Sequence, residues 1–141
     1  MVAQLKSQGD WDNTVVVISS EFGRKLTPNG SEGSDHGWGG HYAVFGGGVR
    51  GGRILGQYPP DLRPSGPYNL GGHGRIMPTM GWESIWSGVG EWMGVETEEE
   101  FDFVLPNLHN VYGNGFFGPY WQSDMFLDGS TGSASTNVFG T

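Results

Sequence analysis

The stretch that decides the expected fold is WDNTVVVISSEFGR, residues 11–24. Residues 14–18 form a run of five β-branched side chains, which is typical of a strand buried on both faces of a parallel sheet. Residues 2–8 resemble the end of a helix that Gly9 closes, so helix, turn and strand follow one another as in a βαβ unit. Because one strand cannot form such a sheet, the sequence predicts the C-terminal piece of a larger α/β protein.

Composition narrows the classes of protein to which the chain can belong. Its 141 residues suffice for one domain with a modest core, and an aromatic content of 13% argues against a disordered chain. The 27 glycines have no three-residue period, which excludes collagen and indicates many loops. A formal net charge of -8 makes nucleic acid an unfavourable partner, and the absence of cysteine excludes disulfides and thiolate metal sites. No apolar run reaches the roughly 20 residues that span a bilayer.

The segments after the first strand are expected to be rich in loops. Residues 25–41 read as a long polar loop, and a short second strand is predicted at 42–45. Residues 49–55 read as a hairpin arm that turns through Gly51 and Gly52.

The clearest helix signals lie in the second half of the chain. Apolar residues recur at helical spacing over 82–93, and Gly94 closes that helix. Thr97 and Glu100 form a capping box for a short acidic helix over 98–104. We therefore divide the chain into a domain over residues 1–112 and a tail rich in Gly, Ser, Thr and aromatic residues over 113–141.

Four side chains near the first strand could hold a divalent metal ion, namely Glu21, Asp35, His36 and His41. Carboxylate and imidazole groups are the usual ligands of Zn²⁺ and Mn²⁺, and α/β sheets place ligands in loops at strand ends. Adjacent Asp35 and His36 would point in different directions. In the plainer interpretation Asp35 starts a turn, His36 donates to a carbonyl oxygen, and His41 opens a strand.

Arg24 also has two interpretations. Its planar guanidinium could bind an oxyanion, or it could pair with Glu21 three residues before it. The glycine clusters at 46–52 and 71–74 match no phosphate-binding motif and are expected to form turns. His73 and His109 read as structural or surface histidines, and no familiar nucleophile motif is present.

Three motifs carry a family resemblance: SEFGR at 20–24, DHGWGG at 35–40 and GRIMPT at 74–79. Together with the segments around them, over residues 3–108, they resemble the C-terminal segment of the domain of unknown function 1501 family (DUF1501). That family is similar in fold to alkaline phosphatases and sulfatases. The resemblance implies an α/β class fold, the C-terminal part of an alkaline-phosphatase-like sandwich with a mostly parallel sheet, loop-rich and incomplete in this chain.

The same resemblance implies a metal site. In alkaline-phosphatase relatives the matching strand ends in an Asp-His pair that binds metal, and this chain has Glu21-Phe22 there, where Phe cannot ligate. The DHGWGGH loop falls where those relatives place a further metal-binding histidine. His36 or His41 would take that role, with Zn²⁺, Mn²⁺ or Ca²⁺ as the cofactor.

For function, the resemblance implies a metal-dependent hydrolase acting on phosphate or sulfate esters, exported to the periplasm or the cell exterior. An anionic ester would be its substrate, with Arg24 as a substrate-binding residue. The nucleophile of such enzymes lies in the N-terminal half, so we expect this chain to be catalytically silent alone, with that missing half as a partner. The alternative is a non-catalytic structural or binding module that keeps the fold.

Overall fold

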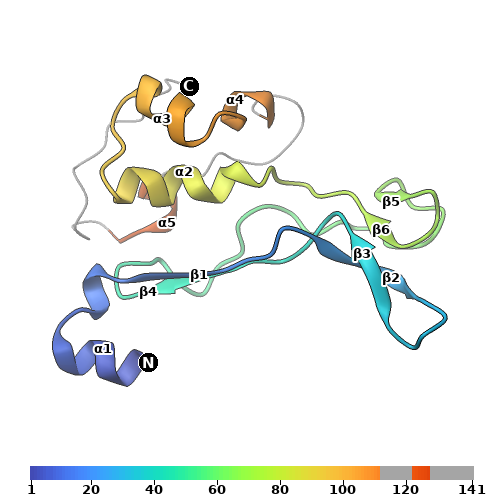
Figure 1. Cartoon of the computed structure of the whole chain (residues 1–141), viewed down its shortest axis with the longest axis horizontal. Coiled ribbons are helices and arrows are strands. Elements are labelled where there is room, and N and C mark those ends of the chain that lie inside the picture. The colour runs from blue at the N-terminus through green and yellow to red at the C-terminus, as the bar shows by residue number, and fades with distance from the viewer. Residues whose placement is uncertain (112–121, 128–141) are drawn as a thin grey trace. The chain divides into compact units, whose positions relative to one another are not determined.

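The computed structural model describes residues 1–111 and 122–127, and every structural statement below concerns these residues (Figure 1). Most of the tail predicted for 113–141 lies outside them. In chain order the elements are α1 (Val2–Gln8), the 3-10 helix η1 (Trp11–Asn13), β1 (Val15–Ile18), β2 (Gly23–Pro28), β3 (Ser34–Gly37), β4 (Ala43–Gly46), β5 (Asn69–Leu70), β6 (Arg75–Ile76), α2 (Glu83–Trp92), α3 (Glu98–Val104), α4 (Leu108–Val111) and α5 (Gln122–Met125).

The chain divides into two compact units, which we describe separately. Unit 1 consists of Met1–Val16, Val44–Leu55 and Met80–Thr141, and unit 2 consists of Val17–Ala43 and Gly56–Thr79. The boundary predicted at residue 112 falls where the first described range ends, and it stays a prediction.

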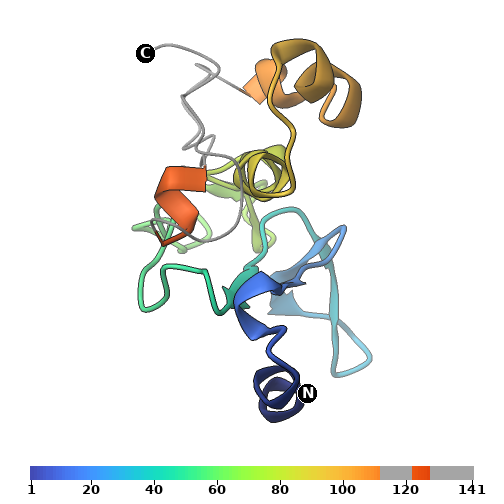
Figure 2. The ribbon, with the colours of Figure 1, turned by 90° about the vertical axis from the view of Figure 1, so that its left-hand side faces the viewer.

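Unit 1 holds the hydrophobic core among its helices. Figures 1 and 2 show α5 beside α2, and α4 also contacts α2. Phe101 of α3 is completely buried and packs with Leu108 at the start of α4, while Val95 and Leu105 flank them. Trp92 at the end of α2 stacks on the buried ring of Phe126, with 5.4 Å between ring centroids. Of the apolar residues predicted over 82–93, Ile85 and Val89 are buried in this core, whereas Trp82 and Met93 are exposed.

A short antiparallel contact joins two distant segments of unit 1. Val49 forms a β-bridge with Phe126, and the backbone N–H of Leu127 donates to the carbonyl of Gly48 over 2.7 Å. Arg50 donates twice, from its backbone N–H to Met125 O and from its side-chain Nε to Phe126 O. The prediction of a hairpin arm over 49–55 is wrong, because the backbone at Val49 and Arg50 bonds to the chain around residue 126 instead.

Unit 2 is built from two small antiparallel sheets. In the first, β2 and β3 pair with Arg24 opposite His36 and Gly23 opposite Gly37. In the second, β5 and β6 pair with Asn69 opposite Ile76. Two backbone bonds join these sheets, Leu26 N–H to Gly74 O at 2.9 Å and Gly39 N–H to Ile76 O at 2.7 Å.

Backbone and turn contacts, not apolar side chains, fill the interior of unit 2. Within residues 17–43 and 56–79, the buried residues are Asn69 and the glycines at 23, 66 and 74. Asn69 receives a hydrogen bond from the N–H of Gly74 at 2.8 Å and donates one to the carbonyl of Leu62 at 3.2 Å. Gly74 adopts a φ of +75°, and a Cβ there would lie 2.7 Å from the backbone N of Thr27.

The expectation of a mostly parallel sheet in an alkaline-phosphatase-like sandwich is wrong for the described residues. They form three two-stranded sheets, β1–β4, β2–β3 and β5–β6, with short antiparallel pairings. A parallel pair needs a long crossover connection, usually a helix. Here β1 is followed instead by β2 and β3, which a short turn joins. The residues of β1 are also only partly buried, and Ile18 is 59% exposed, so β1 is not buried on both faces.

The polar stretch predicted as a loop over 25–41 contains most of the β2–β3 hairpin, and that expectation is wrong too. The side chain of Asn29 closes its turn, because Oδ1 accepts the backbone N–H groups of Ser31 and Gly33, each at 3.0 Å. An Asn that bonds to the backbone two residues ahead forms a recognised turn. Among the described helices, none is long and apolar enough to cross a membrane.

Candidate functional site

The β2–β3 hairpin brings the SEFGR and DHGWGG motifs side by side. Their glycines make this possible, since a Cβ at Gly37 would lie 2.8 Å from the carbonyl carbon of Arg24, and one at Gly23 would overlap the carbonyl oxygen of Gly39. Successive side chains of a strand point to opposite faces. Arg24 and His36 therefore share one face of the hairpin, and the neighbouring residues of each strand share the other.

The first face, which we call the Arg24 face, consists of Phe22, Arg24 and His36. The rings of Phe22 and His36 are stacked, with centroids 3.8 Å apart and planes inclined by 12°. The guanidinium carbon of Arg24 lies 5.0 Å from the Phe22 ring centroid, and its NH1 donates to the carbonyl of Ser34 over 2.8 Å. Arg24 and His36 are both exposed, so this face presents a fixed cation and an imidazole to solvent.

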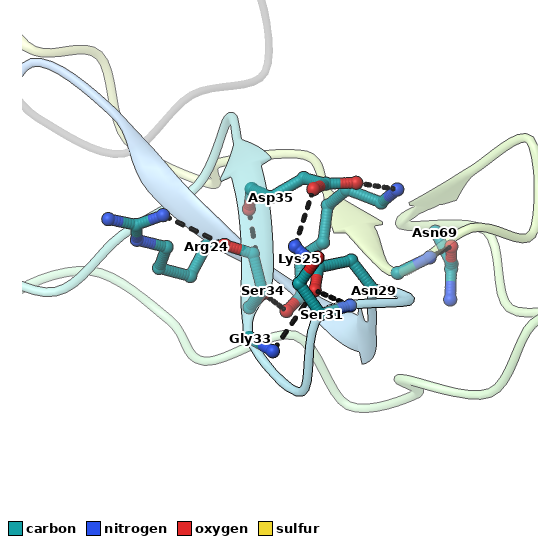
Figure 3. Close-up of polar contacts among 9 residues, drawn as sticks. Arg24, Lys25, Asn29, Ser31, Gly33, Ser34, Asp35 and Asn69 are labelled. Atoms are coloured by element: carbon teal, nitrogen blue, oxygen red, sulfur yellow. Dashed lines mark hydrogen bonds and ion pairs between the residues drawn. The ribbon is translucent and has the colours of Figure 1, made fainter.

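The second face holds Asp35 in a network of its own (Figure 3). Lys25 Nζ and Asn29 Nδ2 each donate to the Asp35 carboxylate over 2.9 Å. The Lys25 side chain is 16% exposed and that of Asp35 is 52% exposed, so the ion pair lies at the surface. The hydrogen bond from Asn29 and the ammonium of Lys25 hold the pKa of Asp35 below its usual value.

Glu21 and His41 lie outside both networks. Glu21 is exposed, and its carboxylate accepts a long hydrogen bond from the hydroxyl of Ser20 at 3.4 Å. His41 stacks on the ring of Tyr58, with centroids 5.3 Å apart and planes inclined by 15°. The His41 imidazole therefore stacks on an aromatic ring, a contact that the sequence around His41 does not predict.

The four predicted metal ligands do not converge on one point in this arrangement. Asp35 and His36 point to opposite faces of β3, so they cannot both bind the same ion without a change of the hairpin. Among residues 1–111 and 122–127, no group of three or more His, Asp or Glu side chains is placed to hold a metal ion. The metal site and its ion stay a prediction of the sequence, and no chemical step is derived from them.

Sequence reasoning missed two residues of the site, Phe22 and Lys25. The sequence identifies Phe22 only as a residue that cannot bind metal, yet its ring is in contact with both Arg24 and His36. The sequence places Lys25 in a polar loop, whereas the structure places it in β2. Once β2 and β3 are aligned in antiparallel register, the positions of both follow from strand alternation, so the missing signal was the hairpin itself.

Two further ion pairs involve a histidine or an arginine. His109 is half-exposed in unit 1, and its Nε2 lies 3.0 Å from Asp102 Oδ1 and 4.0 Å from Glu98 Oε1. This agrees with the interpretation of His109 as a surface histidine. In unit 2, Arg63 binds Asp61 through its side chain and its backbone N–H, which lowers the pKa of Asp61 to about 2.

A known protein family matches part of the chain. The model of a family described as "Protein of unknown function (DUF1501)" matches residues 1–63, a range that includes β1, the β2–β3 hairpin and all the candidate site residues. No curated protein and no solved structure matches the chain. This match supports the resemblance to DUF1501 that SEFGR and DHGWGG carry, whereas GRIMPT at 74–79 lies outside the matched range.

Proposed function

We propose that this protein is a hydrolase-like member of its family that recognises phosphate or sulfate ester groups through Arg24 and His36, and that it is catalytically silent on its own. The observation that carries the proposal is the pairing of Arg24 with His36 on one exposed face, with both against the ring of Phe22. The likeness to alkaline phosphatases and sulfatases is part of the proposal.

The Arg24 face has the chemistry of an oxyanion site. A guanidinium is a planar fork of five N–H donors that matches phosphate and sulfate oxygens, and its bond to Ser34 uses one of them. The bond to Ser34 and the position over the Phe22 ring fix the side chain before any ligand arrives. Less side-chain entropy is then lost on binding. His36 adds an exposed imidazole that can donate to the same anion.

The surroundings of the acidic residues support the proposal of catalytic silence. Metal-assisted hydrolysis needs ions that polarise the ester and activate the attacking group. The Asp35 carboxylate accepts hydrogen bonds from Lys25 and Asn29 on the face opposite His36. The Glu21 carboxylate accepts a hydrogen bond from the hydroxyl of Ser20. As placed, these acids do not share a coordination sphere with a histidine.

Two measurements on the whole chain test this proposal. Aryl phosphate and aryl sulfate esters should show no turnover with added Zn²⁺, Mn²⁺ or Ca²⁺. Turnover that Glu21→Ala abolishes would sink the silent assignment. Inorganic phosphate and sulfate should shift the amide resonances of residues 22–24 and 34–37 in NMR titrations, and Arg24→Gln should weaken that binding by roughly tenfold, the worth of about one charge-assisted hydrogen bond.

A matched control separates recognition from general charge. Arg53→Gln removes the same charge from another exposed arginine, in unit 1, and should leave phosphate and sulfate binding unchanged. Equal losses in both variants would show that the anion responds to net charge rather than to the Arg24 face.

The alternative, a non-catalytic structural or binding module, is favoured by the closed network around Asp35. Its carboxylate already has two donors, so the polar turn is held without any ion. The alternative would be established if the folded protein contained no metal and its Arg24 face bound neither phosphate nor sulfate. Metal analysis of the purified protein together with the same titration distinguishes the two.

A further inference from the structure

The turn between β2 and β3 contains Asn29 followed by Gly30, a pair that has a covalent chemistry of its own. The backbone nitrogen of the glycine attacks Cγ, the side-chain carbonyl carbon of the asparagine, and loses its proton. The amide nitrogen takes up a proton and leaves as ammonia, so a succinimide ring remains. A water molecule then opens the ring to aspartate or isoaspartate, and the chain gains a negative charge. Glycine favours the attack because it has no Cβ to hinder the nitrogen.

The structure does not require glycine at position 30. Its φ is not positive, and a Cβ added to it would have no atom of the described residues within 4 Å. In the same hairpin, an added Cβ would meet the backbone at Gly23 and at Gly37. Gly30 is also exposed. What this glycine contributes is therefore an unhindered backbone nitrogen beside Asn29.

Three hydrogen bonds hold the side-chain amide of Asn29 in the folded turn (Figure 3). Its Oδ1 accepts the backbone N–H groups of Ser31 and Gly33, each at 3.0 Å, and its Nδ2 donates to Asp35 over 2.9 Å. Ring closure removes Nδ2 and draws Cγ toward the backbone nitrogen of Gly30, so these bonds have to break first. The folded turn therefore restrains the reaction, and local opening sets its rate.

We propose that Asn29–Gly30 is a site of spontaneous deamidation, that opening of the β2–β3 turn controls its rate, and that the products prevent the native turn from closing again. Aspartate places a second carboxylate against that of Asp35, where the amide nitrogen had donated a hydrogen bond, and like charges at that distance repel. Isoaspartate moves a CH2 group from the side chain into the backbone, so the bonds to Ser31 and Gly33 cannot keep their geometry.

The reaction acts on the Arg24 face through the register of the hairpin. Pro28 pairs with Ser34 next to the turn, and Arg24 pairs with His36 farther along. Because the turn holds the strands in this register, a lengthened turn changes which side chains lie opposite each other. Hydrolysis releases ammonia, so the change is permanent for each molecule. The proposal concerns the hairpin alone and does not rest on anion binding by the Arg24 face.

Peptide mass spectrometry of the full chain tests the proposal, because it follows conversion at Asn29 during incubation. Conversion should be roughly tenfold slower in the folded chain than in urea, since hydrogen bonds of the turn must be lost first. Asp35→Ala removes the bond to Nδ2 and should speed conversion in the folded chain by roughly fivefold. Asp61→Ala is the matched control, because it removes another carboxylate of unit 2, one that binds Arg63, and should leave the rate unchanged. The second Asn-Gly pair, at 114–115 and outside the described residues, gives a reference rate that neither variant should change.

Two further measurements test the chemistry and its consequence. Gly30→Ala should largely abolish conversion at Asn29 in urea, because the added Cβ hinders the attacking nitrogen. Anion exchange separates the converted chains by their extra negative charge, and mass spectrometry identifies those converted at Asn29. In these chains amide hydrogen exchange of residues 23–28 and 34–37 should be faster, while that of α3 in unit 1 should stay the same.

Four results would overturn the proposal. They are equal rates in the folded chain and in urea, no conversion at Asn29 in urea, conversion that Gly30→Ala leaves undiminished, and equal acceleration by Asp35→Ala and Asp61→Ala. Native protection of the hairpin amides in the converted chains would overturn its second part, that the products prevent the turn from closing.

Discussion

Units 1 and 2 reach a folded state by different means. All six buried hydrophobic side chains of the described residues lie in unit 1, on α2, α3, α4 and α5 and at Phe126. Unit 2 buries glycines and one asparagine, and hydrogen bonds to its backbone hold it. Apolar burial is the dominant favourable term in folding, whereas a hydrogen bond contributes about 1 kcal/mol net. Unit 1 should therefore carry most of the stability, and unit 2 should respond mainly to changes of the backbone.

The largest effect is expected from the core of unit 1. Phe101→Ala should lower the free energy of unfolding by about 3–5 kcal/mol, because a completely buried ring is replaced by a cavity. Phe103→Ala, on the same helix, removes a ring that is 86% exposed and should change stability by less than about 0.5 kcal/mol. Urea denaturation followed by circular dichroism measures both. Similar losses in the two variants would mean that burial does not govern unit 1.

A smaller effect is expected from the backbone of unit 2. Gly74→Ala should cost about 2 kcal/mol or more, because the residue has a positive φ and its Cβ would meet the backbone at Leu26 and Thr27. Gly9→Ala in unit 1 is the control, since Gly9 also has a positive φ but no atom lies within 4 Å of an added Cβ. It should cost only about 1 kcal/mol, the strain of the left-handed region itself. Hydrogen exchange of β5 and β6 shows whether the loss stays in unit 2.

The smallest effect concerns the titration of Asp61 in unit 2. Arg63→Gln should raise the pKa of Asp61 from about 2 toward its ordinary value of 3.8, because the side-chain bonds from Arg63 are lost. Since the folded pKa is depressed, the wild-type pair stabilises the protein above about pH 4 and loses that contribution as the pH falls toward 2. Carboxyl carbon NMR measures the midpoint. The pKa of Asp35 should stay unchanged, because Asn29 and Lys25 lower it.

The helices could be predicted from the sequence because their signals are local. Helix α3 spans Glu98–Val104 as expected, and its capping box is present, with Thr97 accepting from the Glu100 backbone and Glu100 accepting from Thr97. Helix α1 ends at Gly9 and α2 is followed by Gly94, both with positive φ. A helix cap depends on residues within one turn of the helix end, so the residues adjacent in the sequence are enough to predict it.

The sheets were harder, because strand pairing depends on residues distant in the sequence. The β-branched run over residues 14–18 indicates β1, which spans Val15–Ile18, but its pattern does not specify which strand lies beside it. The sequence does not indicate the β2–β3 hairpin, because polar and glycine residues are poor strand formers. Its register is fixed by the turn at Asn29 and by close backbone approach at Gly37, neither of which an apolar pattern reveals.

The candidate site was predicted only in part for the same reason. The sequence indicates Arg24 and His36 as site candidates and predicts that Asp35 points in a different direction from His36. That Arg24 and His36 are cross-strand partners followed only from the register, as did the ion pair between Lys25 and Asp35. The sequence shows which residue types are present, whereas the pairing of strands in the fold decides which of them lie close together.

The bridge between Val49 and Phe126 bears on how the protein is made. During synthesis the β2–β3 hairpin can form as soon as it leaves the ribosome, because its contacts are local in the chain. The bridge closes a long loop, so the backbone at Gly48 and Arg50 has to wait until residues 125–127 have emerged. We expect nascent chains halted before residue 122 to stay susceptible to proteases within residues 44–55, and the core of unit 1 to be completed only after residues 125–127 have been synthesised.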